Sequence, residues 1–140
     1  MENNIILTFK IICAAIGGFC ATLWGALDGV MMVLLAFIAI DYITGLMVGI
    51  VTKTLNSSTG FKGLAKKVFI LLLVLIANIL DVYIMGGSGV VRGVVIAFYI
   101  ANEGISILEN AGKLGVPYPQ KLKEVLEQLK ESEDENANKL

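Results

Sequence analysis

The stretch that decides the fold runs from Gly29 to Thr52 and reads GVMMVLLAFIAIDYITGLMVGIVT. Among these residues one side chain, that of Asp41, carries a charge. A helix needs about 20 predominantly apolar residues to cross the hydrocarbon core of a bilayer. The length and apolar character of the stretch therefore predict a transmembrane helix rather than a helix of a water-soluble domain.

The composition of the whole chain points to the same environment. Of its 140 residues, 56% are hydrophobic and 16% are charged, and the mean hydropathy is +0.80. Soluble domains are roughly 45–50% apolar and about 25% charged. A soluble core of this size could not hide so much apolar surface, whereas a bilayer accepts it as solvent.

Apolar segments on either side extend the pattern to four predicted spans. They cover residues 5–27, 29–52, 68–85 and 89–108 of a membrane domain at 1–116, and a tail follows at 117–140. The glycine cluster at 86–89 is a turn signal between the last two spans. The alternative is three spans, with the third helix running through that cluster.

The tail is expected to form a short amphipathic helix. Its apolar residues recur every three or four positions among charged ones. These residues are Leu122, Val125, Leu126 and Leu129. From Ser132 onward the tail is polar, and we expect disorder there. The predicted fold class is an all-α membrane protein with four, alternatively three, transmembrane helices and a cytoplasmic C-terminal helix.

The lysines predict the orientation. Basic residues are enriched in cytoplasmic loops, and the predicted loop at 53–67 contains no acid. Its lysines are Lys53, Lys62, Lys66 and Lys67. Two spans precede this loop and two follow it, so both termini are expected in the cytoplasm.

Small residues at four-residue spacing line three of the predicted spans. They are Gly17, Gly18, Ala21 and Gly25 in the first span, Gly45 and Gly49 in the second, and Gly89, Gly93 and Ala97 in the fourth. Helices in lipid associate through close packing at such residues. The packing can lie within one chain or between copies in a homo-oligomer, and the pattern leaves both open.

Four charged residues fall within or at the ends of the spans. Asp41 lies at mid-span, where an ionised carboxylate costs roughly 2.5–3.5 kcal/mol. It should therefore face protein or water, either as a polar staple to a partner helix or as the lining of a lumen. Asp81 and Arg92 either pair across the glycine turn or each reach toward the interface. Glu103 is expected at the inner interface.

Other residue patterns argue against an enzyme. The chain has no histidine, and its two cysteines, Cys13 and Cys20, are interpreted as small buried side chains. There is no phosphate loop, nucleophile elbow or metal-ligand cluster, so no catalytic, cofactor or metal site is predicted. No basic stripe with interleaved aromatics predicts nucleic-acid binding.

Four short segments carry a resemblance to a known family. They read DYITG at 41–45, KGLAKK at 62–67, NEGISILEN at 102–110 and LGVPYP at 114–119. The sequence resembles bacteriophage holins of the group that also includes holin-like proteins for clostridial toxin release. The resemblance covers about residues 5–130.

The resemblance implies a function that composition cannot give. Holins accumulate in the bacterial cytoplasmic membrane and assemble, at a set time, into lesions that lead to host cell lysis. An endolysin or a large toxin leaves through the lesion, as a functional partner that need not bind the holin. The rival interpretations are a small multi-helix transporter or ion channel and a membrane scaffold subunit.

Overall fold

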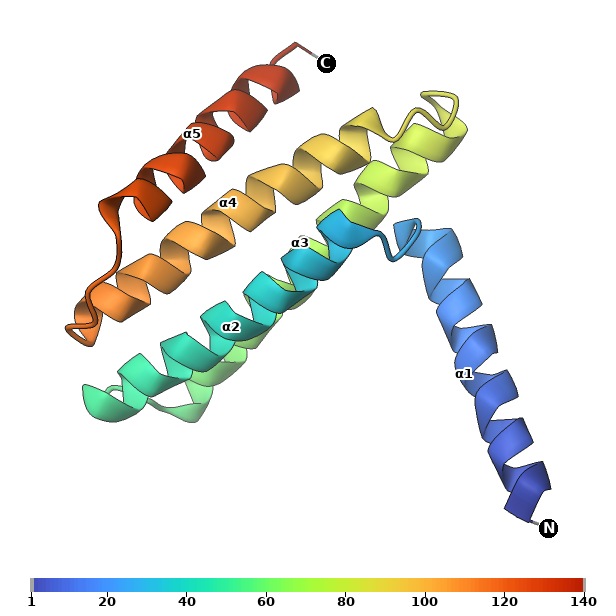
Figure 1. Ribbon diagram of the computed structural model, residues 1–140, viewed down its shortest axis with the longest axis horizontal. Helices are drawn as coiled ribbons and strands as arrows, with labels where there is room; N and C mark the ends of the chain where they lie inside the picture. Colours follow the sequence, from blue (N-terminus) through green and yellow to red (C-terminus); the bar gives the residue numbers. More distant parts are fainter. Residues whose placement is uncertain (1, 140) are drawn as a thin grey trace.

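The computed structural model describes residues 2–139, which form five α-helices (Figure 1). They are α1 (Glu2–Trp24), α2 (Gly29–Val51), α3 (Ser57–Tyr83), α4 (Val90–Lys113) and α5 (Gln120–Ala137). The first four are long and apolar enough to cross a membrane. The predicted all-α class with four spans and a C-terminal helix is therefore confirmed. The three-span alternative is wrong, because the chain turns back between α3 and α4.

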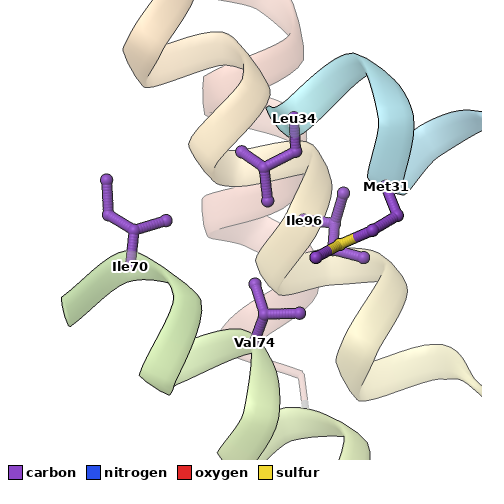
Figure 2. Packing of buried hydrophobic residues seen from close by; sticks show 5 residues of the cluster. All are labelled: Met31, Leu34, Ile70, Val74 and Ile96. Carbon is purple, nitrogen blue, oxygen red and sulfur yellow. The ribbon is translucent and has the colours of Figure 1, made fainter. Parts of the chain in front are cut away.

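Helices α2, α3 and α4 form the packed centre of the molecule. Met31 and Leu34 of α2 meet Ile70 and Val74 of α3 and Ile96 of α4 (Figure 2). Leu34, Val74 and Ile96 are completely buried. In lipid, such contacts stabilise by close packing rather than by removal of apolar surface from water.

Helix α1 extends away from this centre and touches α3 only near its end (Figure 1). None of residues 3–24 is buried inside the chain. The helix ends at Trp24, earlier than the predicted 27, because Gly25 adopts a left-handed backbone with φ of +77°. A glycine in this conformation is the common way to end a helix. Gly25 also packs closely, because a side chain there would come within 2.7 Å of Arg92 and 2.9 Å of Asn78.

Helix α3 begins at Ser57, so most of the basic loop predicted at 53–67 is helical. The Asn56 side chain accepts a hydrogen bond from the Thr59 amide at 2.8 Å, and the Thr59 hydroxyl accepts one from the Asn56 amide at 3.1 Å. This reciprocal capping box fixes the start of the helix. Of the four loop lysines, only Lys53 remains in the connection.

The tail is more ordered than its polar sequence predicts. Helix α5 extends to Ala137 and includes residues after Ser132 that were expected to be disordered. Gly115, with φ of +72°, follows the end of α4. The chain then reverses, and α5 runs antiparallel along α4 (Figure 1). Packing along α4 gives the polar end of the tail a helical partner.

Candidate functional site

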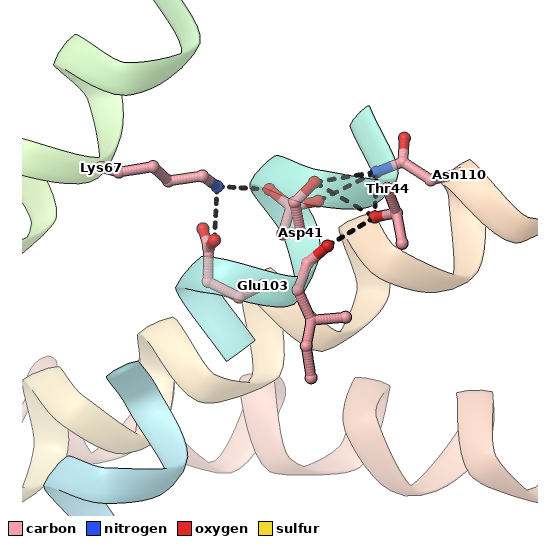
Figure 3. Close-up of polar contacts among 6 residues, drawn as sticks. Asp41, Thr44, Lys67, Glu103 and Asn110 are labelled. Atoms are coloured by element: carbon pink, nitrogen blue, oxygen red, sulfur yellow. Dashed lines mark hydrogen bonds and ion pairs between the residues drawn. The ribbon is translucent and has the colours of Figure 1, made fainter. Parts of the chain in front are cut away.

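The inner polar cluster joins the three central helices through charged side chains (Figure 3). Lys67 of α3 donates hydrogen bonds to both Asp41 of α2 and Glu103 of α4. The Asn110 amide of α4 donates to the Asp41 carboxylate at 3.1 Å and to the Thr44 hydroxyl at 3.0 Å. Asp41 therefore accepts from α3 and from α4, and the cluster fixes the register of all three helices.

One ammonium group in this cluster lies between two carboxylates. Asp41 is 7% exposed and Glu103 is 2% exposed. Taking charges out of water is costly, and the mutual attraction of an ion pair offsets that cost only when its hydrogen bonds are complete. Among the side chains that the structure describes, no buried nitrogen or oxygen lacks a partner. The cluster is thus satisfied as it stands, with two carboxyl groups sharing one ammonium group.

These contacts clarify the two roles left open for Asp41. Its carboxylate acts as a staple between helices, and it also lines a cavity of about 790 Å³ among α2, α3 and α4. The lining includes Tyr42, Lys66 and Ser106, so polar groups face the space. A cavity of this size, with polar and apolar lining, has room for many water molecules. The ion pairs therefore stand beside a space that water can enter.

Glu103 is buried among the central helices, and its expected place at the inner interface stays a prediction. The helix α4 continues to Lys113, five residues beyond the predicted 108, which places Glu103 well inside the helix. The sequence also gave no partner for Asp41, because Lys67 was assigned to a loop. The capping box at Asn56 and Thr59 was the available signal that Lys67 lies on a helix.

The outer polar cluster ties the connection between α1 and α2 to α4. The Arg92 guanidinium donates to the Asp28 carboxylate at 2.9 Å, to the Ala26 carbonyl at 2.8 Å and to the Trp24 carbonyl at 2.7 Å. Asp28 also caps α2 by accepting from the Met31 amide at 3.0 Å. The hydrogen bond from Arg92 holds the pKa of Asp28 below its usual range.

Asp81 and Arg92 do not form the ion pair that was one of two predicted outcomes. Asp81 is 1% exposed, and its carboxylate accepts hydrogen bonds from the backbone amides of Val91 at 3.1 Å and Arg92 at 2.6 Å. The glycine turn brings the first free amides of α4 over the last turn of α3. A carboxylate at this position satisfies amides that the helix itself cannot bond. Asp81 therefore caps α4, and Arg92 reaches Asp28 instead.

The predicted small residues differ in what surrounds them. A side chain built at Gly17, Gly18 or Gly93 would meet nothing within 4 Å, so these positions have no packing partner within the chain. Gly45 faces the Asn110 side chain and Gly49 faces Leu55, which belongs to the returning loop. Ala21 and Ala97 are half-buried, and Gly89 lies in the turn before α4.

One close glycine contact was not predicted. A side chain at Gly104 of α4 would come within 2.9 Å of Leu126 of α5 and 3.1 Å of Phe37 of α2. The absence of a side chain at this position lets α5 approach α4 closely. Within residues 2–139 no group of three or more acidic or cysteine side chains is placed to hold a metal ion.

Comparison with known families gives a match over most of the chain. Residues 18–131 match the model of the bacteriophage holin family. The matched range contains both polar clusters and most of α5. No solved structure matches the chain.

Individual proteins are also similar to this chain over most of its length. An uncharacterized 14.9 kDa protein in the nagH 3′ region of Clostridium perfringens is 43% identical over 91% of this chain and 96% of its own length. An uncharacterized protein of Listeria monocytogenes is 43% identical over 88% of this chain and 86% of its own length. A protein of Bacillus phage phi105 named "Probable holin" is 36% identical over 71% of this chain and 73% of its own length.

Proposed function

The chain belongs to the bacteriophage holin family, and from this premise we propose that it assembles in the host cytoplasmic membrane and opens lesions. An endolysin or a large toxin would leave the cytoplasm through them. The proposed role requires no catalysis by this chain. The observation that carries the proposal is the cluster of Asp41, Lys67 and Glu103, which lies between spanning helices and beside a cavity that these side chains help to line.

The cluster suits a membrane protein that must rearrange. While the helices are together, each charge has a partner and none faces lipid. When the helices separate around water, the same side chains regain hydration, and a buried ion pair is worth little more than its hydrated parts. The free-energy difference between the packed and the water-lined arrangements is therefore small. Association between copies can then determine which arrangement is favoured.

Association between copies is needed on geometric grounds. One α-helix is about 10–12 Å across, so four spans cannot enclose a passage for a folded enzyme. Helix α1 supports the proposal, because its apolar surface and the faces at Gly17 and Gly18 meet no other part of the chain. We expect these faces to pack against other copies. Association by mass action would then delay lysis until enough protein has accumulated.

The proposed orientation places both termini in the cytoplasm. The end of α2, the start of α3 and the end of α4 lie at the same end of the molecule (Figure 1). That end carries Lys53, Lys62, Lys66 and Lys113. Asp28 and the glycine turn lie at the opposite end, so the lysine bias places them outside the cytoplasm.

Controlled expression in a bacterium tests the proposal. The chain is expressed with and without a cytoplasmic wall hydrolase that has no export signal. We expect abrupt growth arrest with the chain alone and lysis only with both. Depolarisation without release of the hydrolase would indicate a channel or transporter instead. Continued growth, with the protein in the membrane, would indicate a scaffold subunit.

A further inference from the structure

Helix α5 is highly charged, yet it lies along a helix that spans the membrane. Its 18 residues include nine charged side chains. They are Lys121, Lys123, Glu124, Glu127, Lys130, Glu131, Glu133, Asp134 and Glu135. Toward its end, Asp134 and Ala137 border the same pocket as Val91 and Val94 at the start of α4. The tail therefore follows α4 over most of its length.

Specific contacts hold α5 in this position. Leu126 is buried in the notch that Gly104 leaves on α4, beside Phe37 of α2. The Lys130 ammonium lies 3.5 Å from the Asn102 side-chain oxygen and 5.9 Å from the centre of the Phe98 ring. The fit of Leu126 into a glycine notch is a shape match between two particular helices, which a helix resting loosely on a surface would not need.

The charged side chains on the exposed face of α5 restrict the environment that can surround the helix. Glu127, Glu131 and Glu135 are exposed on the side away from α4. The helix is about 27 Å long, close to the roughly 30 Å thickness of the hydrocarbon core. Charged side chains along that whole depth cannot face lipid. Resting on the proposed function, we infer that α5 docks on α4 where that face borders water, and that α5 lines the lumen of the assembled lesion.

Before assembly, α5 occupies a second position, at the inner surface of the membrane. Leu122 and Val125 are exposed even when α5 is docked. Together with Leu126 they form the apolar stripe of an amphipathic helix, which suits the inner surface of the membrane. In an isolated copy surrounded by lipid, α5 lies at that surface. It moves into the Gly104 notch when neighbouring copies replace lipid by water along α4.

Crosslinking during dye release tests the movement. The full chain with Cys13→Ser and Cys20→Ser carries Asn102→Cys and Lys130→Cys, and is reconstituted in phosphatidylethanolamine and phosphatidylglycerol vesicles at increasing protein-to-lipid ratio. A short bis-maleimide, which adds one cysteine thiol to each of its two double bonds, joins the pair only when α5 is docked. We expect the intramolecular yield to rise several-fold as dye release begins. The matched control, Asn102→Cys with Lys121→Cys, lies out of reach and should stay unjoined.

The outcomes separate this inference from the proposed function. Dye release with a crosslinking yield that stays low would overturn the docked position of α5 in the lesion, and a yield that is high at every ratio would overturn its movement; either result would leave the lesion itself intact. Absence of release at every ratio would refute the proposed function, and the inference with it.

Ion preference tests the lumen directly. The helix carries three lysines and six acids, so a lumen lined by α5 should pass small cationic dyes before anionic ones of equal size. The change Glu131→Lys with Glu135→Lys should reverse or abolish that preference, and the neutral pair Glu131→Gln with Glu135→Gln should lie between. Equal preference in all three proteins would contradict a lumen-facing α5.

Discussion

Replacing Lys67 by methionine removes the one cation of the inner cluster. Its ammonium bonds two carboxylates, on Asp41 and Glu103, that are almost fully buried. Removing one partner of a buried ion pair typically costs about 3–5 kcal/mol, because a charge is left uncompensated. Here two like charges would remain, so one carboxyl is expected to bind a proton, which limits the cost to about 3 kcal/mol.

This cost falls on the packed arrangement, because separated helices hydrate the carboxylates. A change of about 3 kcal/mol shifts the balance between packed and water-lined arrangements roughly 100-fold toward the latter. We therefore expect Lys67→Met to start lysis earlier at equal protein level and to lower the thermal stability of the protein in detergent. The assay is the onset of lysis after induction, with the amount of membrane-inserted protein measured in parallel.

Two controls make the result decisive. Lys66→Met removes a neighbouring lysine that bonds neither carboxylate, and should change the onset little. The triple change Lys67→Met with Asp41→Asn and Glu103→Gln removes all three charges at similar volume and should recover most of the stability. If Lys67→Met inserted normally but matched Lys66→Met in onset and stability, the cluster would not hold the helices together.

Three further predictions concern the helix ends. Asp81→Ala removes the cap of α4 and should lower stability by about 1–2 kcal/mol, measured by thermal unfolding in detergent, with Asp81→Asn losing less. Because the pKa of Asp28 is lowered in the folded chain, its bond to Arg92 contributes fully above the ordinary carboxyl pKa and is lost as pH falls through the lowered value. Fluorescence of Trp24, the single tryptophan, should report that loss, and Asp28→Asn should remove this part of the pH response. Lys53 has φ of +56°, so Lys53→Gly should raise the unfolding temperature by relieving about 1 kcal/mol of strain. The control Lys62→Gly places a glycine inside α3 and should lower the unfolding temperature. An equally large drop for Lys53→Gly would contradict the prediction.

The two polar clusters hold different parts of the chain together. The outer cluster, built on Arg92 and Asp81, ties the α1–α2 connection and the start of α4 together. The inner cluster holds α2, α3 and α4 and borders the cavity. Helix α1 is held at its C-terminal end, by hydrogen bonds of the Trp24 indole and of the Leu23 and Trp24 carbonyls. This arrangement leaves most of the length of α1 without contacts to the three central helices.

The sequence by itself determined the number of spans and their approximate limits. Whether a segment crosses a membrane depends on the sum of hydropathy over about 20 consecutive residues, and that sum is a local property. The turn at Gly86 to Gly89 was readable for the same reason, since glycine signals a turn through its own backbone freedom. The amphipathic character of α5 was also visible in the spacing of Leu122, Val125 and Leu126.

Only the tertiary structure decided which polar groups meet. Arg92 could have reached Asp81 or Asp28, and the choice follows from where the glycine turn places the first amides of α4. Lys67 lies 26 residues from Asp41 and 36 from Glu103, and such pairing depends on the rotation of each helix about its axis. The position of α5 depends on Gly104, whose missing side chain leaves space for Leu126. This contact joins residues of two different helices, so it is visible only in the tertiary structure.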